Sequence, residues 1–559
     1  MDNIEEFTPD PIVKLTERIK LNADKNPYGI AVIKPVSKDK SGRTTFSHLT
    51  FKRLDEETDH LAKELEYAGM RKGLRTLVMM EPGPDYISIV YALFKIGAVP
   101  VIMSPGITQK EFLSCVKDAS IEAFIGSARG HLIRILNASC FKSVTTVFTC
   151  GQKFFWGGHF ISTNTTEASS EFKTDALKEN DTALIFYTPG VTGRSKGVIH
   201  TLSSLDATIS NLVKLFDVRK DDVNLSLHPY FLLLFPAMGM TSVIPDIDLN
   251  FPLEADMSRI TDLVTQIGIT HIMASPSIFS MIGDCMTEGE IVLPSIRKII
   301  VFGTQIIPEF MTDFMTGINE AVNIVLSYGS TEVFPVSTLD CKEMLTETKH
   351  LSEKGFGTCI GKPVSGLNIE LITASDDSIT HLRNEVMVSD GNVGEIVING
   401  TPVSPSYYEY AKADAYSKIT DSDKSVWHRS GDLAWRDKKG RLWLCGRKSQ
   451  AVKTTQGPLF TISCETIFNM HPDVHRSALV GVGDTSNQTP VMLVELEKKC
   501  GKRRKTEIVE ELLELARSNE ATHMIETILI HEGFPVDGYH LSKIIREELR
   551  IFAEKIMLG

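Results

Sequence analysis

The stretch that decides the fold reads Phe186-Tyr187-Thr188-Pro189-Gly190-Val191-Thr192-Gly193-Arg194-Ser195-Lys196-Gly197-Val198. A β-favouring apolar run over residues 183–187 leads into a loop rich in glycine and threonine, and a second apolar segment begins at Val198. Glycine lets a backbone approach phosphate oxygens, N–H groups and hydroxyls donate hydrogen bonds, and lysine neutralises charge. The loop is not a Walker A loop, because Lys196 follows Gly193 by three positions and precedes glycine rather than serine or threonine. By itself the stretch fits a phosphate-binding loop and an ordinary surface turn equally well.

Strands and helices alternate on both sides of this loop. Before it, the sequence predicts a strand over 77–80, a helix over 87–96 that ends at Gly97, and a strand over 99–103. After it, we expect a helix over 203–216 and strands over 269–273, 298–302 and 323–326. This alternation indicates βαβ units and mostly parallel sheets, so the predicted fold class is α/β.

Beyond residue 355 the pattern changes. Short strands over 394–398 and 440–445 lie between turns rich in Gly, Asp and Asn, which indicates an antiparallel β subdomain. The residues from 446 onward are expected to form a small α+β domain. The basic run 498–505 has glutamates on both sides and is interpreted as a solvated loop.

Length and charge limit the class of protein. A chain of 559 residues is too long for one core, so we expect two or more domains. A net charge of −12 argues against a nucleic-acid partner. The nine cysteines form no CxxC pair and no cluster with histidine at zinc spacing, which fits reduced thiols in an intracellular protein.

The termini and the most apolar stretch bear on location. Residues 1–6 are acidic without a signal-peptide core, and residues 556–559 are neither a peroxisomal tripeptide nor a prenylation box, so we expect a cytoplasmic protein. The stretch 227–245 contains His228, Pro229 and Pro236, which fits a buried strand, turn and helix better than a membrane span. Peripheral contact with a membrane stays open.

Further polar clusters follow predicted strands. The strand over 298–302 runs into Gly303-Thr304-Gln305, and the strand over 323–326 runs into Ser327-Tyr328-Gly329-Ser330-Thr331-Glu332. In α/β sheets, ligands bind at the carboxyl ends of strands. These clusters are therefore candidate binding residues.

The motifs taken together resemble those of the adenylate-forming superfamily, which includes acyl-CoA synthetases, peptide-synthetase adenylation domains and luciferases. Its motifs are matched in order by 188–197, Tyr328-Gly329-Ser330-Thr331-Glu332, His428-Arg429-Ser430-Gly431-Asp432, Gly446-Arg447-Lys448, and Pro535-Val536-Asp537 with Lys543. The resemblance extends from Asn22 to Leu549. Within the superfamily the chain looks most similar to the olefin-biosynthesis β-lactone synthetases and their acyl-CoA-synthetase-like relatives, on segments 75–105, 332–337, 357–363 and 443–448.

The resemblance implies a large domain over residues 1–445, made of mixed, mostly parallel α/β sheets with an antiparallel β subdomain. A small mobile α+β domain over 446–559 would follow. It also implies that ATP and Mg²⁺ act on a small carboxylic acid to give an acyl-adenylate and pyrophosphate, with CoA as the expected second substrate. Because two anions must meet, cations and fixed hydrogen-bond donors would carry most of the catalysis. The oligomeric state is not predicted.

The resemblance also implies a role for each matched residue. Thr188, Gly190, Thr192, Gly193 and Lys196 would hold the triphosphate, whereas Gly303, Thr304, Tyr328 and Gly329 would frame the adenine. Asp432 and Arg447 would bind the ribose. Thr331 would contact the α-phosphate, Glu332 would ligate Mg²⁺, and Lys543 would reach the reacting carboxylate.

Structural alternatives stay open for several of these residues. Asp432 could instead be a turn residue, and Glu332 could begin a helix. Lys543 could occupy a solvated position on a helix, and Arg447 could form a structural ion pair. His228 and His428 are interpreted as structural histidines.

The chain departs from the superfamily pattern at three places. Pro189 and Val191 replace hydroxyl residues of the phosphate loop, and Ser195 replaces proline. Two lost hydrogen bonds to charged groups, at roughly 1.5–3 kcal/mol each, would slow adenylation by on the order of 10²–10⁴. Ser449 stands two residues after the hinge arginine, Arg447, where Asp or Lys is common, and the residues 538–542 before Lys543 also differ.

Three functions are compatible with these observations. The first is an acyl-CoA ligase for an apolar, fatty-type acid, with residues 231–235 either lining an acyl tunnel or packing between sheet and helix. The second is a β-lactone synthetase that activates a β-hydroxy acid without CoA. The third is a degenerate ATP-binding or scaffold protein.

Overall fold

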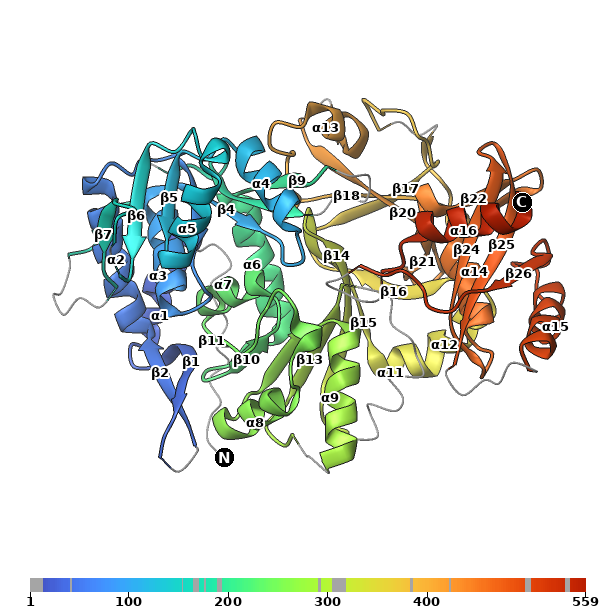
Figure 1. Ribbon diagram of the computed structural model, residues 1–559, viewed down its shortest axis with the longest axis horizontal. Helices are drawn as coiled ribbons and strands as arrows, with labels where there is room; N and C mark the ends of the chain where they lie inside the picture. Colours follow the sequence, from blue (N-terminus) through green and yellow to red (C-terminus); the bar gives the residue numbers. More distant parts are fainter. Residues whose placement is uncertain are drawn as a thin grey trace.

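The computed structural model describes residues 14–40, 43–152, 154–163, 170–174, 177–188, 194–289, 293–303, 318–382, 386–421, 424–497, 504–537 and 543–558. These residues form an elongated molecule, with the N-terminal elements at one end and the C-terminal elements at the other (Figure 1). The predicted α/β class is confirmed.

A seven-stranded sheet lies at the N-terminal end. Its order is β7 (His159–Ile161), β6 (Thr146–Cys150), β5 (Ala123–Gly126), β3 (Arg75–Met79), β4 (Val99–Met103), β8 (Thr182–Thr188) and β9 (Lys196–Thr201). All pairs are parallel except β8 with β9. In β5, Ala123 and Ile125 pack towards α2 (Phe51–Tyr67) and α3 (Pro84–Ile96), whereas Phe124 packs towards α4 (Gln109–Asp118). Because both faces are covered, the strands are almost continuously apolar.

A second, larger sheet crosses the centre of the molecule. Its order is β17 (Asn368–Ile372), β18 (Gly394–Asn399), β20 (Val426–Arg436), β21 (Leu442–Arg447), β16 (Thr358–Pro363), β15 (Val333–Asp340), β14 (Asn323–Ser330), β13 (Lys298–Phe302), β12 (His271–Ala274), β10 (Val223–Ser226), β11 (Thr241–Val243), β1 (Ile30–Lys38) and β2 (Thr44–Thr50). A further strand, β19 (Lys418–Thr420), pairs with β20. Pairing is parallel from β1 with β11 to β13 with β14, and antiparallel from β14 with β15 to β17 with β18.

The two sheets share an apolar core. It contains residues of α1 (Leu15–Lys25), α3, α6 (Leu202–Phe216) and α7 (Pro229–Met238), together with one face each of β8, β12 and β13. The stretch 227–245 contains the buried helix α7 followed by strand β11, so its burial is confirmed, whereas the predicted order of strand, turn and helix is wrong. Among the described residues, no helix has both the length and the apolar character that crossing a membrane requires.

The C-terminal elements have cores of their own. Strands β24 (Val474–Asp484), β25 (Asn487–Leu496) and β26 (Thr527–Ile530) pack with α14 (Thr461–Phe468), α15 (Arg504–Arg517) and α16 (Arg546–Leu558), beside a hairpin of β22 (Val452–Thr454) and β23 (Gly457–Leu459). Two clusters of buried apolar side chains consist entirely of residues within 452–553. We call residues 452–558 the small lobe and the preceding residues the large lobe.

Most predicted elements lie within a few residues of their observed positions. Gly97 ends α3 with a left-handed backbone (φ 76°), and α6 begins one residue before its predicted start. The predicted loop over 498–505 is wrong at its end, because Arg504 and Lys505 already belong to α15; residues 498–503 lie outside the described residues. The strand predicted over 323–326 continues to Ser330, because β15 pairs along its whole length.

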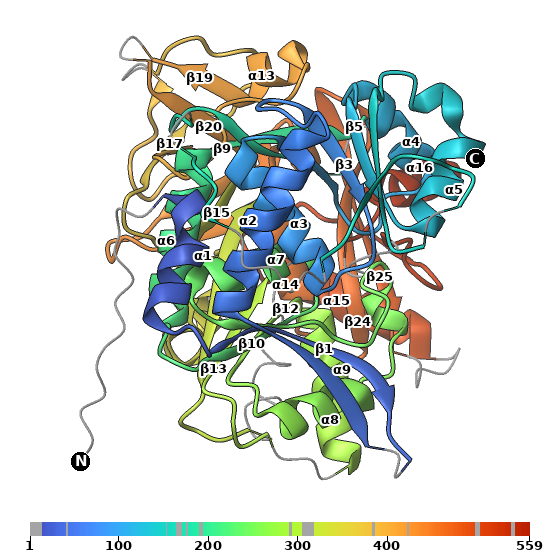
Figure 2. The ribbon, with the colours of Figure 1, turned by 90° about the vertical axis from the view of Figure 1, so that its left-hand side faces the viewer.

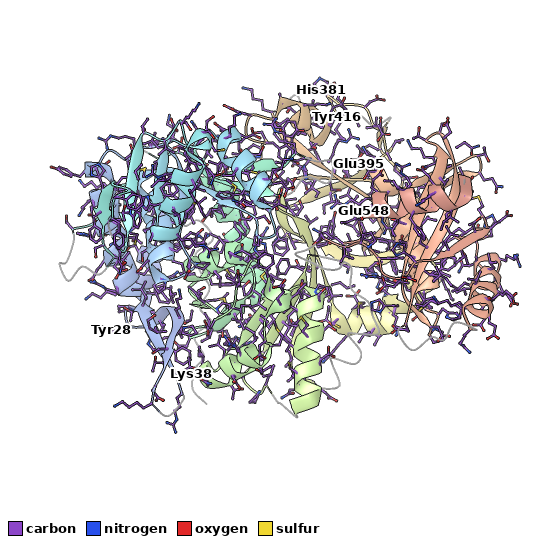
Figure 3. All side chains as sticks on the ribbon, viewed as in Figure 1. Tyr28, Lys38, His381, Glu395, Tyr416 and Glu548 are labelled. Carbon is purple, nitrogen blue, oxygen red and sulfur yellow. The ribbon has the colours of Figure 1, made fainter. Side chains whose placement is uncertain are left out.

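A buried ion pair fixes the antiparallel strands to one another. Arg429 in β20 donates to the Glu395 carboxylate of β18 over 2.7 Å, and both side chains are only 1% exposed. Arg429 also donates to the carbonyls of Ser375 and Asp377. Glu395 lies in the part of the sheet that borders the small lobe (Figure 3).

We therefore expect Arg429→Leu to destabilise the large lobe strongly, because Glu395 would keep a buried charge without its main partner. The expected loss in free energy of unfolding is about 3–5 kcal/mol, measured by urea denaturation. Arg259→Leu is the matched control, since its pair with Asp246 is exposed, and it should cost less than about 1 kcal/mol. Equal losses for both variants would contradict this account.

Candidate active site

The phosphate-loop candidate is the connection between β8 and β9. Thr188 ends β8, Lys196 begins β9, and the two residues face each other across the hairpin. Gly190, Thr192 and Gly193, like Pro189 and Val191, lie outside the described residues.

Residues 406–408, which are distant from β9 in the sequence, lie along that strand. The Tyr408 N–H donates to the carbonyl of Gly197 over 2.7 Å, and the Ile199 N–H donates to that of Ser406 over 3.1 Å. Tyr407 is thereby placed beside the loop, with its ring centre 4.9 Å from Lys196 Nζ.

The motif at 327–332 forms the tip of the β14–β15 hairpin. Ser330 pairs with Val333, so Thr331 and Glu332 occupy the turn between the strands. Glu332 therefore does not begin a helix, and that alternative is wrong. A Cβ on Gly329 would lie 2.9 Å from the Val333 carbonyl oxygen, which explains the glycine.

Gly303 lies one strand away from this hairpin. Phe302 and Ser327 are partners in the β13–β14 pairing, so Gly303 follows beside Tyr328. Gly303 has a φ of +99°, which favours glycine, and the space at its Cβ position is open. Thr304 lies outside the described residues.

Glu332 is held by hydrogen bonds from the segment beside β9. The Tyr407 hydroxyl donates to Glu332 Oε1 over 2.6 Å, and the Ser404 N–H donates to the Glu332 carbonyl over 2.8 Å. Lys418 in turn donates to the Ser404 carbonyl over 2.6 Å, with its Nζ 5.5 Å from the Tyr407 ring centre. Lys196 and Lys418 thus both approach the tyrosine that contacts Glu332.

The Glu332 carboxylate in this cluster is ionised at neutral pH. Burial raises the pKa of Glu332. Three effects outweigh burial and bring this pKa to about 2: the charge that His428 carries at such low pH, the hydrogen bond from Tyr407 and the charge of Lys418. Burial lowers the pKa of His428 to about 3, so its ring is neutral at pH 7. Burial also lowers the pKa of Lys418 to about 8, against the opposing effect of Glu332. Lys418 is therefore the buried cation that compensates Glu332.

Asp432 lies in a second polar group on the antiparallel strands. The Tyr328 hydroxyl donates to Asp432 Oδ2 over 2.5 Å, and Arg447 Nε lies 2.9 Å from Oδ1. Asp432 and Arg447 are direct partners in the β20–β21 pairing. Burial raises the pKa of Asp432, whereas the Asp432 charge raises the pKa of Arg447. Asp432 is thus more than a turn residue, and Arg447 does form the ion pair considered from the sequence.

Lys543 approaches this group from the small lobe. Its carbonyl accepts a hydrogen bond from the Asp537 N–H over 3.0 Å, and Val536 and Ile544 form an isolated β-bridge, so the strand-like segment has a defined backbone. The Lys543 side chain keeps solvent contact although protein atoms crowd it. Burial lowers its pKa, the charge of Asp537 raises it, and the charges of Arg447 and Asp432 act on it as well. Lys543 is therefore near the large lobe's Asp432–Arg447 pair.

Sequence reasoning missed Tyr407 and Lys418. They lie 75 and 86 positions after Glu332 in a segment without a recognised motif, and only the pairing with β9 reveals their place. His428 was interpreted as structural, and its Nδ1 indeed lies 3.2 Å from the Ser417 carbonyl oxygen. His228 packs in an aromatic group with Phe186 and Phe302.

Residues 231–235 of α7 are all buried in the apolar core. Leu232, Leu233, Leu234 and Phe235 belong to the core, as the packing alternative expects. Phe231 contacts the rings of Phe302 and Phe334, with centroids 5.1 and 5.4 Å apart, and so borders the end of β13.

Comparison with known proteins agrees with this arrangement. The AMP-binding enzyme family matches residues 20–408. An olefin β-lactone synthetase from Xanthomonas campestris pv. campestris is 34% identical, with 95% of this chain and 96% of that protein covered. A 2-succinylbenzoate–CoA ligase from Bacillus thuringiensis subsp. konkukian is 24% identical, with 91% and 94% covered.

The fold agrees as well. A structure of O-succinylbenzoate coenzyme A synthetase from Bacillus subtilis in complex with ATP and magnesium ion has a TM-score of 0.70 at 19% identity, with 95% of this chain and 99% of that chain covered. The family match spans more than half of the chain, and the 34% identical relative spans nearly all of it. The chain belongs to the AMP-binding enzyme family and is an adenylate-forming ligase.

Proposed function

We propose that the protein activates a β-hydroxy carboxylic acid with ATP and closes it to a β-lactone without CoA. The observation that carries this proposal is the 34% identity to an olefin β-lactone synthetase over nearly the full length of both chains, compared with 24% for a CoA ligase. This reverses the order of the first two hypotheses drawn from the sequence. The third, a degenerate scaffold, is kept as an outcome of the experiment.

The proposed reaction has two steps. A carboxylate oxygen attacks the α-phosphorus of ATP, a P–O bond forms, and pyrophosphate leaves. The β-hydroxyl oxygen then attacks the acyl carbon, the bond from that carbon to the AMP oxygen breaks, and the hydroxyl proton passes to solvent or a nearby base. AMP and the lactone are the products.

The nucleotide roles follow from the resemblance and are supported by the geometry. Thr188, Lys196 and the loop between them would hold the triphosphate, and Gly303 with Tyr328 would frame the adenine. Asp432 would accept hydrogen bonds from the ribose, because Tyr328 and Arg447 fix its carboxylate while each oxygen keeps acceptor capacity. Lys543 would serve the reacting carboxylate.

The residues present fit a magnesium ion that arrives with ATP. Among the described residues, no three His, Cys, Asp or Glu side chains are grouped to hold a metal alone. Mg²⁺ in nucleotide sites commonly uses one or two carboxylates plus substrate phosphates. Glu332, ionised and fixed by Tyr407, is the carboxylate we propose, and the ion would offset phosphate charge.

We also propose separate roles for the two domains. We propose residues 1–445 as the nucleotide-binding domain and 446–559 as the domain that delivers Lys543. Separate apolar clusters in the two lobes support independent packing. The nearness of Lys543 to Asp432 and Arg447 supports an arrangement suited to adenylation.

His200 is a buried histidine beside the Thr331–Glu332 turn. Its ring is 3% exposed and lies beside Tyr230. Burial lowers the pKa of His200 to about 4, against the opposing effects of the Glu332 charge and of a hydrogen bond with the Thr331 backbone, so the imidazole is neutral at pH 7.

A CoA ligase is the second candidate, since the 24% identical relative is named as one. A pyrophosphate-release screen separates the candidates. Matched straight-chain acids with and without a 3-hydroxyl are compared with and without CoA, and products are weighed by mass spectrometry. We expect release with the 3-hydroxy acids in the absence of CoA, and a product lighter than the acid by one water.

Other outcomes of the screen would redirect the assignment. Product formed only with CoA would establish the ligase instead. If no acid promotes ATP consumption and Pro189→Ser with Val191→Thr adds none, both enzymatic candidates fail, and ATP binding alone would favour the scaffold.

Removing the Tyr407 hydroxyl should lower the catalytic efficiency with ATP. Tyr407→Phe deletes the donor to the Glu332 carboxylate, a charged hydrogen bond that contributes roughly 1.5–3 kcal/mol. We expect kcat/KM for ATP to fall by about 10–10² and the requirement for Mg²⁺ to change. Tyr408→Phe is the control, because among the described residues that hydroxyl donates to Glu409 alone, over 3.4 Å and in an exposed position. Identical kinetics for both variants would exclude this role for Tyr407.

Lys418 should make stability depend on pH. The folded protein releases its proton near pH 8, whereas the unfolded chain keeps it until about pH 10.5. Between these values the unfolded chain binds more protons, so this group's contribution to stability increases with pH. Relative to Lys418→Met, the free energy of unfolding of the wild type should rise by about 2–3 kcal/mol from pH 8 to 10.5. Parallel stability curves for the two proteins would contradict the lowered pKa.

A further inference from the structure

An apolar surface lies on the outer side of the seven-stranded sheet, at the end of the molecule away from the small lobe (Figures 1 and 2). We call it the α5 surface; it comprises α5 (Ala128–Leu136) and residues 154–160. Its large apolar side chains are well exposed: Leu132 49%, Ile135 37%, Leu136 73%, Phe154 56%, Phe155 82% and Phe160 48%. Single exposed apolar residues are normal, but a contiguous group of them marks an interaction surface.

The phenylalanines project from an anchored segment. The Trp156 ring stacks on His131 of α5 at 5.5 Å between centroids, and Arg134 donates to the Trp156 carbonyl over 3.1 Å. Phe154 and Phe155 each meet the Trp156 ring edge-on, at 5.0 and 5.4 Å. The aromatic side chains are thus tied to the helix while they remain open to solvent.

The charge of this region is opposite to that of the chain. Between Glu122 and Glu167 the sequence contains no Asp or Glu but four cations, Arg129, Arg134, Lys142 and Lys153, whereas the whole chain has a net charge of −12. Arg129, which lies on α5 three residues before Leu132, is exposed, and so is Lys142. Two acidic residues contact the edges of this region: the Glu122 carbonyl accepts from the Thr145 N–H, and Asp85 of α3 accepts from the Thr163 hydroxyl.

Aromatic and aliphatic side chains with cations beside them suit one kind of partner. Trp and Phe enter the boundary between headgroups and acyl chains, and Lys or Arg are attracted to anionic headgroups. A second copy of this acidic chain would offer negative charge but no apolar layer for the phenylalanines to enter. The charge complementarity therefore favours a lipid surface over a protein.

We propose that the α5 surface binds peripherally to membranes that contain anionic lipid, with Phe154 and Phe155 inserted at the headgroup boundary. The cations Arg129 and Lys142 contact the headgroups. Binding here leaves the proposed active site free, because that site lies at β9, β14 and β20, and the inference does not depend on which acid the enzyme activates.

The test is co-sedimentation of the full chain with vesicles of phosphatidylcholine, with or without phosphatidylglycerol. We expect binding only to vesicles with phosphatidylglycerol, and weaker binding at higher salt. Phe154→Ser with Phe155→Ser should reduce the partition coefficient at least about tenfold. Arg129→Gln with Lys142→Gln should reduce it about fivefold per cation.

The matched control carries Tyr28→Ser with Phe251→Ser, two aromatic residues exposed by 80% and 51% on other parts of the surface; Tyr28 is marked in Figure 3. It should bind like the wild type, and pyrophosphate release in solution reports that each variant is folded. Absence of wild-type binding, or equal loss in the control, would overturn the proposal. Concentration-dependent dimerisation abolished by the Phe154 and Phe155 changes, without vesicle binding, would assign the surface to a second copy instead.

Discussion

The site depends on keeping the Glu332 carboxylate ionised inside the protein. An isolated buried carboxylate would take up a proton rather than accept the loss of hydration. Here the Tyr407 hydroxyl supplies a short hydrogen bond, and Lys418 supplies a positive charge that is itself held by the Ser404 carbonyl. Each partner depends on the others: without Glu332, Lys418 would lose one of the two carboxylates whose charges offset its own, and without Lys418 the segment carrying Tyr407 would lose an anchor.

The sheet topology explains how these groups meet. Glu332 lies at the tip of a hairpin on the central sheet, whereas Lys196 begins a strand of the other sheet. The segment 404–408 bridges them, because it bonds to Glu332 at one end and to β9 at the other. The second group forms by strand register alone, since Asp432 and Arg447 are direct partners. The contacts around Glu332 therefore join the two sheets, whereas the contact between Asp432 and Arg447 lies within the central sheet.

The fold was largely predictable because its strands are buried and its helices end at clear signals. Gly97 and the apolar runs before Gly303 and Ser327 identified the parallel core correctly. The sequence also placed Tyr328, Glu332, Asp432 and Lys543 in one site, by resemblance to a family. The sequence did not show which residues contact Glu332. Tyr407 and Lys418 reach it because their segment pairs with a strand that is distant in the sequence, and a local sequence pattern does not predict which strand a segment will pair with. The extension of β14 to Ser330 was missed for the same reason, since β15 is what pairs it.

The contacts around the start of the small lobe also limit where that lobe can turn. Arg447 is bound to Asp432, and Lys448 lies 3.3 Å from the Glu395 carboxylate that already holds Arg429. Both residues are thus fixed to the large lobe, although the sequence placed the domain boundary before them. Ser449 and Gln450 follow in a short 3₁₀ turn before β22. Any rotation of the small lobe that preserves these ion pairs would therefore take place after Lys448. A pivot at that point would swing Lys543 away from Asp432 and Arg447 without disturbing either of them.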